Sequence, residues 1–468
     1  MEDVEAERDG LAGPAPDADD VRAGLAGPVV STADAAREPS QPPPPEGPEL
    51  LAAALRWLDE LVAQPTVTFE PNLTLIAAAE AHLAANGAQT TITHAPDGRR
   101  ANVFATFGPS IDGGVVLSGH TDVVPAAAAD WGGDPFRVRR ITEQGEDGPH
   151  ERLYGRGTAD MKGFIACVLA MAPTFAATSL TRPIHVALTF DEEVGCLGAP
   201  VLLDELARTG PLPAAAIIGE PTSMALAYGH KGCFEFTTTF TGVEGHGSAP
   251  EQGCNAILWA ARYVDELAAL GARFAAGAAA DSPFDPPGTT INVGTIGGGA
   301  ARNVIAGGCS LDWELRPVTT ADAEAALAAV DALDARIHAG MRAQHPDAGL
   351  TRETAGAVGG LEPRADSVAL ELVDRLLAGL EQDASADPPR VRAPRGAPQV
   401  MAYNTEAGLF QAAGIDAVLC GPGSIEVAHQ PDEFVELDQL RWCLELLGAL
   451  TDELTDELAD GPADTRTP

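Results

Sequence analysis

Residues 117–125 read LSGHTDVVP, and they set His120 and Asp122 directly after the apolar run 114–117. This run is typical of the end of a buried parallel strand. Open α/β sheets bind ligands beyond the carboxyl ends of such strands. Because residues i and i+2 of an extended segment share a face, we expect the Asp122 carboxylate to lie behind the His120 imidazole, as a metal-binding histidine requires. Taken alone the pair is a weak signal, and a surface pair is the simpler alternative.

Strand-like and helix-like runs alternate around this segment. Strands are expected at 101–107, 114–117, 185–190 and 214–218, and helices from residue 50 and at 73–86, 163–177 and 199–209. A second set of such signals returns near the end of the chain, with helices at 367–380 and 437–454 and a strand at 417–420. Such alternation predicts an α/β fold with a central sheet covered by helices on both faces.

The pattern changes after Glu220. A strand at 234–242, a helix at 255–270, strands at 289–296 and 309–316 and a helix at 321–343 predict a smaller α+β unit inserted into the first domain. The glycine-rich run GTIGGG could suggest a dinucleotide-binding loop, but no helix start follows it, so a hairpin is expected. The predicted divisions are 1–47 (a disordered acidic, Pro- and Ala-rich extension), 48–225, 226–356, 357–456 and 457–468 (a flexible tail).

Composition excludes several classes of partner. The chain has 468 residues and a formal net charge of −39, which argues against nucleic acid and against anionic membrane surfaces. Its seven cysteines are odd in number and form no CxxC pair, so reduced thiols are expected. The chain starts with acidic residues, and no apolar run is long enough to span a bilayer. We therefore expect a soluble cytoplasmic protein.

Acidic residues and a second histidine follow other apolar runs. These are Asp160 in YGRGTADMKGF, Glu192 and Glu193 after HVALTF, Glu220 after AAIIG, and His429 in the loop after AVLC. Nitrogen and oxygen ligands without thiolates suit zinc and its neighbours. Five ligands are too many for one tetrahedral ion, but they suit two ions that share a carboxylate and activate water for hydrolysis.

The adjacent glutamates should differ in role. On an extended chain Glu192 and Glu193 point in opposite directions, so one would bind metal and the other would be free to act as a base. The alternative is an exposed acidic pair, which is common in so acidic a chain. Their position directly after an apolar strand favours the functional interpretation.

Five motifs occur in a specific order: SGHTDVVP, GRGTADMKG, DEEVGCLGA, IGEPT and AHQPDEF. In this respect the chain resembles, from about residue 50 to 455, the co-catalytic zinc amidohydrolases and peptidases. This family includes acetylornithine deacetylase, succinyl-diaminopimelate desuccinylase, carboxypeptidase G and the aminoacylases. The resemblance implies that a central mixed sheet forms a di-metal catalytic domain and that the inserted unit is a ferredoxin-like lid and dimerisation domain. A homodimer is therefore expected.

The resemblance also implies the ligands of two zinc ions per chain, with Co²⁺ or Mn²⁺ as substitutes. His120 and Glu220 would bind one ion, Glu193 and His429 the other, and Asp160 would bridge them. In relatives the peptide bond after the bridging aspartate is cis, which implies a cis bond after Asp160.

Further roles follow from the same resemblance. Asp122 would orient the first histidine, and Glu192 would be the general acid and base. From the inserted domain, His246 would stabilise the oxyanion, acting from the partner subunit of a dimer, while Asn303 and Arg316 would hold the substrate carboxylate. An arginine suits a carboxylate because its planar fork binds both oxygens.

Within the family, the segments 229–232, 245–257 and 404–411 and the region around His429 most resemble acetylornithine deacetylase. The implied reaction is hydrolysis of N2-acetyl-L-ornithine to L-ornithine and acetate, a step of arginine biosynthesis. The alternatives are a related amidohydrolase acting on succinyl-diaminopimelate, another N-acyl amino acid or a dipeptide, and a metal-free binding relative. Gly247, Ala306 and Gln430 depart from the family pattern without removing a ligand.

Overall fold

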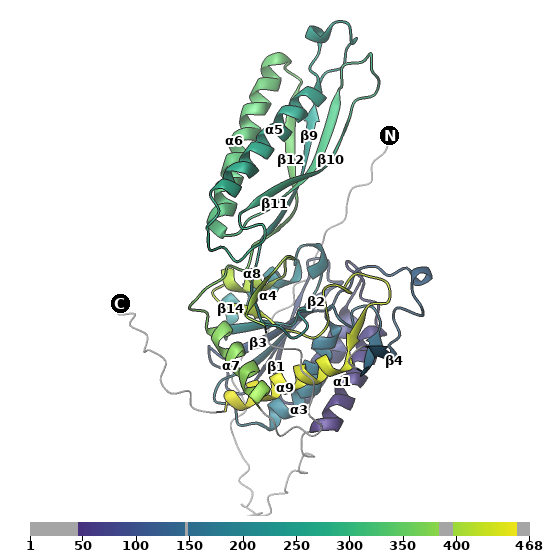
Figure 1. The fold of residues 1–468 in the computed structure, drawn as a ribbon, viewed down its shortest axis with the longest axis vertical. Coiled ribbons are helices and arrows are strands. Elements are labelled where there is room, and N and C mark those ends of the chain that lie inside the picture. Colours follow the sequence, from purple (N-terminus) through teal and green to yellow (C-terminus); the bar gives the residue numbers. More distant parts are fainter. Residues whose placement is uncertain (1–44, 146–147, 383–395, 456–468) are drawn as a thin grey trace, which may run out of the picture. The chain divides into compact units, whose positions relative to one another are not determined.

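The computed structural model describes residues 45–145, 148–382 and 396–455 (Figure 1). The predicted tail 457–468 and the predicted extension up to residue 44 lie outside these ranges. Within these ranges, the expected helices and strands lie close to their expected positions. The structure also contains strands that we did not predict, such as β1 (Gln89–His94), β4 (Arg139–Gly145) and β5 (Gly148–Tyr154).

The central sheet has eight strands in the order β1-β2-β6-β3-β7-β14-β8-β13. Neighbours β6, β3, β7 and β14 are parallel, whereas β1, β2 and β6 pair antiparallel, so the sheet is mixed, as predicted. In sheet order, the strands are β1 (Gln89–His94), β2 (Ala101–Phe107), β6 (Ile184–Thr189), β3 (Val115–His120), β7 (Ala215–Ile218), β14 (Asp416–Leu419), β8 (Ala227–His230) and β13 (Gln399–Met401).

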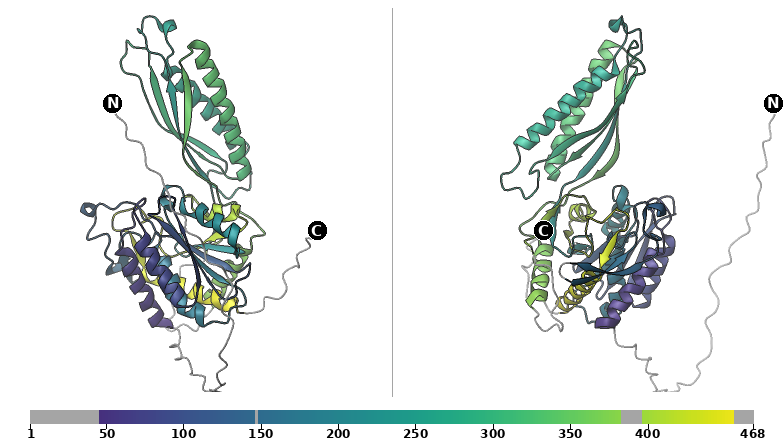
Figure 2. Two further views of the ribbon diagram at one scale, coloured as in Figure 1. Left: turned by 180° about the vertical axis from the view of Figure 1, so that it is seen from behind. Right: turned by 45° about the vertical axis from the view of Figure 1, so that its right-hand side comes forward.

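Helices cover both faces of this sheet, which confirms the predicted fold class (Figures 1 and 2). Along β3, Val115 and Leu117 enter one hydrophobic core and Val116 enters the other, because successive strand residues face opposite sides. The first core is closed by α1 (Gly47–Val62), α2 (Leu73–Ala85), α3 (Lys162–Ala177), α7 (Val368–Gln382) and α9 (Leu437–Glu453). The second is closed by α4 (Gly198–Thr209) and α8 (Ala407–Ala412).

A separate three-stranded sheet, which we did not predict from the sequence, has the order β15-β5-β4. Its strands are β4 (Arg139–Gly145), β5 (Gly148–Tyr154) and β15 (Phe434–Glu436). Charged residues hide the period-two pattern in β4 and β5, and β15 has only 3 residues. The pairing of β15 with β5 brings the loop after β5 beside the segment that follows His429.

The inserted unit follows the chain order βαββαβ. Its elements are β9 (Cys233–Thr241), α5 (Ala256–Ala276), β10 (Thr290–Gly298), β11 (Gly308–Arg316), α6 (Thr320–Gln344) and β12 (Gly349–Val358). The antiparallel strands lie in the order β10-β11-β9-β12, which is the predicted ferredoxin-like arrangement. Phe240, Tyr263 and Trp313 belong to a core of its own. The domain boundaries at 226 and 356 stay predictions.

Two local predictions about this unit have clear outcomes. The glycine-rich run ends β10 and leads into the antiparallel strand β11, so the predicted hairpin is confirmed. The helix expected at 255–270 continues to Ala276, because Phe274 still packs against the hydrophobic core.

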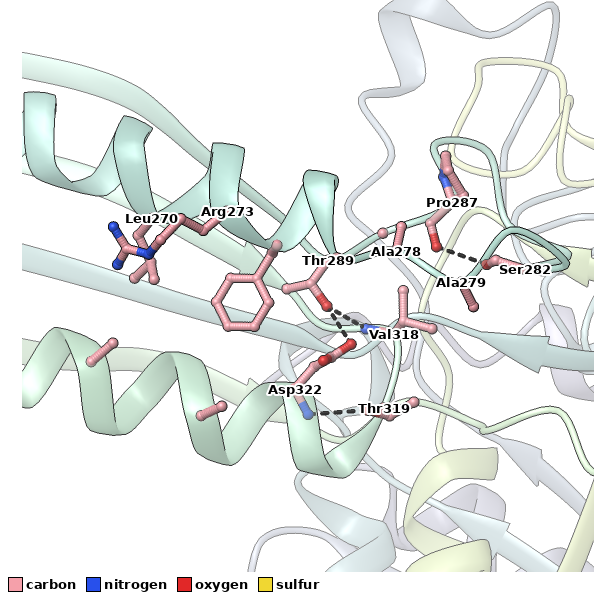
Figure 3. Close-up of a pocket in the computed structure, with 15 residues that line it drawn as sticks. Leu270, Arg273, Ala278, Ala279, Ser282, Pro287, Thr289, Val318, Thr319 and Asp322 are labelled. Atoms are coloured by element: carbon pink, nitrogen blue, oxygen red, sulfur yellow. Dashed lines mark hydrogen bonds between the residues drawn. The ribbon is translucent and has the colours of Figure 1, made fainter.

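A hollow of about 570 Å³ lies beside the C-terminal end of α5 and the N-terminal end of α6 (Figure 3). Three of its polar residues are hydrogen-bonded around the start of α6. Thr289 donates to the Asp322 carboxylate at 2.8 Å and accepts from the Val318 N–H at 3.0 Å, while Thr319 accepts from the Asp322 N–H at 3.0 Å. These groups cap α6 and join it to the neighbouring loop.

Two expectations from composition concern cysteines and membranes. All seven cysteines lie in the described ranges, and each is a free thiol. Among the described helices, none combines the length and apolar character needed to cross a bilayer. The cytoplasmic location stays a prediction.

Buried His185 should make stability depend on pH. Burial lowers the pKa of His185 to about 4, although the Gly113 carbonyl opposes this shift. Between pH 6.5, the ordinary pKa, and pH 4, the unfolded chain binds a proton that the folded chain excludes, so stability is lost as the pH falls. We expect this residue to contribute about 2 kcal/mol of lost stability between pH 7 and pH 5.

The measurement is urea unfolding at pH 7 and pH 5 for wild type, His185→Gln and the exposed control His94→Gln. The pH-dependent loss should shrink only in His185→Gln. An equal loss in all three proteins would contradict the assignment.

Candidate metal centre

Three predicted ligands meet at one edge of the central sheet. His120 is the last residue of β3, Glu193 follows the end of β6, and Glu220 follows the end of β7. Because these neighbouring strands are parallel, their carboxyl ends lie at the same edge. Asp160 reaches the edge from the loop before α3, and His429 from the loop after β14.

The five side chains form two groups that share Asp160. Ligand atoms of His120, Asp160 and Glu220 all lie within 4.8 Å of one another, and so do those of Asp160, Glu193 and His429. The two oxygens of Asp160 face different histidines: Oδ1 is 3.0 Å from His120 Nε2, and Oδ2 is 3.0 Å from His429 Nε2. His429 Nε2 is also 2.9 Å from Glu193 Oε2. This geometry is the one expected of a carboxylate that bridges two cation sites.

The electrostatics of these groups fit divalent cations. Glu220 is buried, and its Oε1 atom has no hydrogen-bond partner in the described part of the chain. Burial raises the pKa of Glu220 well above its ordinary value, and the nearby charges of Asp160 and Glu192 raise it further. An uncompensated buried carboxylate is costly, and a bound cation would remove that cost.

The pKa of Glu192 is raised to about 8, first by burial and then by neighbouring carboxylates, while the charge of His120 opposes the shift. Hydrogen bonds to Asp160 and Glu193 raise the pKa of His429 to about 10. Each group is thus driven toward its protonated form, Glu192 mainly by burial and His429 by its carboxylate partners. Nitrogen and oxygen donors in such a site suit zinc-like ions.

The Asp122 carboxylate lies behind the His120 imidazole, as predicted, but the shortest contact of the ring is with the backbone of Asp122. The Nδ1 atom of His120 is 2.9 Å from the backbone oxygen of Asp122 and 3.6 Å from the carboxylate of that residue. The carboxylate also accepts backbone N–H bonds from Glu192 at 3.0 Å and from Glu193 at 3.3 Å. Asp122 therefore joins the end of β3 to the turn that carries both glutamates.

The expectation that the two glutamates lie on an extended chain was wrong. They form a 3-10 turn, Glu192–Val194, which begins after Asp191 in the left-handed conformation (φ 49°). Asp191 holds this turn because its carboxylate accepts the Phe69 N–H at 2.9 Å and pairs with Arg100. The side chains still separate: Glu193 contacts His429, whereas Glu192 Oε1 accepts a bond from the Cys196 thiol at 3.3 Å.

Glu433 is a supporting residue to which we assigned no role from the sequence. It is fully buried, and its carboxylate accepts the N–H groups of Gly157 at 3.0 Å, Ala159 at 2.8 Å and Asp160 at 3.0 Å. Arg156 adds an ion pair at 2.8 Å. Glu433 therefore fixes the loop that presents Asp160. Its place in the motif AHQPDEF, four residues after His429, was the available signal. The predicted cis peptide bond after Asp160 is present.

Glu433→Gln should weaken metal binding about 10- to 100-fold while the protein remains folded, because supporting partners of ligands have effects of this size. The amide keeps the shape but loses the negative charge that three N–H groups and Arg156 require. Competition with a chromogenic chelator measures the affinity. Glu436→Gln, three residues further on the rim of the small sheet, is the matched control. Wild-type affinity in Glu433→Gln would contradict this role.

The three residues expected to act from the inserted domain have local partners. His246 is exposed, with Nδ1 2.7 Å from the Ser248 hydroxyl. Asn303 is exposed, and its backbone oxygen accepts the Gly247 N–H at 2.7 Å. Arg316 forms an ion pair with Glu314 at 2.8 Å. All of these partners belong to the inserted domain, so the roles of the three residues stay predictions.

A third group of donor atoms within 4.8 Å of one another comprises Cys233, Glu235 and Glu314. Burial raises the pKa of the Cys233 thiol to about 11, although the charge of Arg316 opposes this shift. The thiol is therefore protonated, and the Arg316 guanidinium already supplies a cation beside Glu314. These features make the group a poor metal site.

Comparisons with known proteins agree with this geometry. The profile of peptidase family M20/M25/M40 matches residues 116–453. The chain is 36% identical over 405 residues to an acetylornithine deacetylase of Myxococcus xanthus, covering 85% of this chain and 97% of that protein. It is 34% identical over 404 residues to an acetylornithine deacetylase of Proteus mirabilis, covering 84% and 94%.

Solved structures show the same fold at low sequence identity. A family M20 metallo-carboxypeptidase from Sulfolobus solfataricus matches with a TM-score of 0.63 at 14% identity, covering 86% of this chain and 99% of that chain. A tripeptidase from Staphylococcus aureus matches with a TM-score of 0.62 at 17% identity, covering 86% and 98%.

Proposed function

We propose that this chain, which belongs to peptidase family M20/M25/M40, hydrolyses N2-acetyl-L-ornithine to L-ornithine and acetate. It is a metal-dependent hydrolase. The choice of substrate is supported by the relatives named acetylornithine deacetylase, which match over most of both chains. The observation that carries the chemistry is the pair of ligand groups that share Asp160. Glu192 lies beside them and belongs to neither group.

We propose two zinc ions as the resident metals. His120 and Glu220 would hold one, Glu193 and His429 the other, and the two oxygens of Asp160 would serve both. When bound, such ions polarise the acyl carbonyl and make water acidic enough to react at neutral pH. The buried Glu220 oxygen, which has no hydrogen-bond partner among the described residues, supports this assignment.

Glu192 is the proton carrier of the proposed reaction. Its position beside Asp122, Asp160 and Glu193, without a place in either ligand group, leaves it free to move protons. It removes a proton from water as the oxygen bonds to the acyl carbon. It then returns the proton to the amine nitrogen as the carbon–nitrogen bond breaks, so one carboxylate serves both steps.

The inserted domain is proposed to complete the site from a second copy of the chain. His246 would meet the acyl oxygen, and Asn303 and Arg316 would hold the substrate carboxylate, with Glu314 orienting the Arg316 guanidinium. A free edge supports a homodimer, because among the described strands β10 pairs only with β11, and Ile296 on β10 is 55% exposed. Leu258 on α5, also in the inserted domain, is 58% exposed.

A substrate panel at fixed zinc concentration tests the proposed substrate. The panel holds N2-acetyl-L-ornithine, N-succinyl-diaminopimelate, other N-acetyl amino acids and a dipeptide. We expect the highest kcat/KM for acetylornithine. If another amide is cleaved rapidly and acetylornithine is not cleaved, that amide becomes the proposed substrate, and the family assignment does not change.

Mixed subunits test the proposed dimer. His246→Ala subunits and Glu192→Gln subunits should each be inactive alone. Mixing them should restore part of the activity, because a heterodimer then contains one site with an intact Glu192 and an intact His246 from the partner. If both variants are inactive alone and no activity returns on mixing, His246 acts within its own chain.

A further inference from the structure

Tyr403 carries a buried hydroxyl that the proposed reaction does not yet use. This hydroxyl has no hydrogen-bond partner in the described part of the chain. The side chain packs against the core on the α4 and α8 face of the sheet, so its apolar ring is well accommodated while its polar end is not. Native proteins rarely leave a buried hydroxyl unpaired, and the exceptions call for a functional explanation.

The hydroxyl lies close enough to the metal centre to interact with the charges of its carboxylates. Burial raises the pKa of Tyr403, and the negative charges of Glu220, Asp160 and Glu192 raise it further. The chain that follows also approaches this edge of the sheet, because the Glu406 carboxylate accepts hydrogen bonds from the hydroxyls of Ser118 on β3 and Thr189 on β6. Ser118 is two residues before the predicted ligand His120.

The residues around Tyr403 are held in place by the main domain. Met401 pairs with His230 where β13 meets β8. The Asn404 side chain donates to the Lys231 carbonyl at 3.0 Å, and the Thr405 hydroxyl is 3.0 Å from His230 Nε2. A donor fixed in this way needs no reorganisation during a reaction, which is the condition under which hydrogen bonds stabilise a transition state.

The side chains assigned as metal ligands do not supply an uncommitted donor of this kind. Ionised carboxylates only accept hydrogen bonds, whereas a tyrosine hydroxyl donates. The Nε2 atoms of His120 and His429 already face Asp160. In the described part of the chain, the Tyr403 hydroxyl is a neutral donor without a partner that the main domain places near these carboxylates.

We propose that the Tyr403 hydroxyl donates a hydrogen bond to the acyl oxygen of the substrate as negative charge develops on it. This role rests on the proposed hydrolysis of an N-acyl amino acid and adds a catalytic residue to it. It is separate from the role of His246, because Tyr403 belongs to the main domain and would act in the chain that holds the metals.

Tyr403→Phe keeps the ring and removes only the hydroxyl. We expect kcat to fall about 100-fold, the loss typical of one oxyanion donor, with KM nearly unchanged. Zinc content should match that of wild type. A phosphinate analogue of the acetyl amide, which mimics the tetrahedral intermediate, should bind more weakly by a similar factor, whereas inhibition by the product L-ornithine should not change.

Tyr228→Phe on β8 is the matched control, since Tyr228 is a partly buried tyrosine packed against the hydrophobic core. It should retain wild-type kcat. Three results in Tyr403→Phe would overturn the proposal: an unchanged kcat, a loss confined to KM, or a loss of zinc. Wild type is assayed on the same amide. An inactive wild-type protein would contradict the proposed function, whereas a fully active Tyr403→Phe variant would contradict only the role of Tyr403.

Discussion

Glu192→Gln should retain both metals and lose turnover about 10³- to 10⁴-fold, near the upper limit for removal of a general acid and base. The substitution preserves the size of the side chain but removes its ability to accept a proton. Because Glu192 belongs to neither ligand group, metal affinity should stay close to that of wild type. Both kcat/KM and zinc per chain are measured on the same preparation.

Glu193→Gln is the variant to compare with Glu192→Gln, because Glu193 is assigned as a metal ligand and Glu192 as the base. It should lose metal, because Glu193 lies 2.9 Å from His429 within the second ligand group. Glu205→Gln, on the exterior of α4, should change neither property. Normal turnover in Glu192→Gln would reject the assignment of the base, and equal metal loss in both Glu192 and Glu193 variants would show that both glutamates are ligands.

Removal of metal should abolish hydrolysis and destabilise the fold. Activity should fall below about 1% because no other group can acidify water to this extent at neutral pH. The buried carboxylates of Asp160 and Glu220 would then lie close together without compensating cations. A ligand present at about 1,000 times its Kd stabilises a protein by about 4 kcal/mol, so a loss of this order is expected in the apo-protein.

The measurement is dialysis against a chelator, followed by assay, thermal unfolding and titration with Zn²⁺, Co²⁺ or Mn²⁺. Activity should return in proportion to bound metal and reach its maximum near two ions per chain. Asp160→Asn should reduce the binding of both ions together, since its two oxygens face different histidines. Full activity in fully chelated protein would contradict the metal-dependent mechanism.

Local sequence patterns were sufficient to predict the sheet and the ligand candidates. Apolar runs at β3, β6 and β7 are long enough to be recognised as buried strands, and each is followed closely by His120, Glu193 or Glu220. Parallel strands place their carboxyl ends at one edge, so adjacency of these residues follows from a rule of sheet topology. The order of five motifs added the family, which the comparisons confirm.

Other features depend on contacts between distant segments. The left-handed Asp191 and the 3-10 turn after it are held by Phe69 and Arg100, more than ninety residues earlier in the chain. Glu433 supports the Asp160 loop across 273 residues of sequence. Neither contact leaves a periodic signal, because each is a single side chain that meets backbone groups from another part of the fold.

The amino-acid sequence by itself therefore determined the α/β class, the first five elements (βαββα) of the inserted unit and the candidate ligands, since these depend on periodicity and on position relative to strand ends. The last strand of that unit, β12, was not predicted from periodicity. Only the tertiary structure decided that the two oxygens of Asp160 face different histidines, and that within the described ranges Glu220 and Tyr403 keep polar atoms without partners. The physical reason is that burial, pairing and charge compensation are properties of the assembled set of side chains, and no single segment contains them.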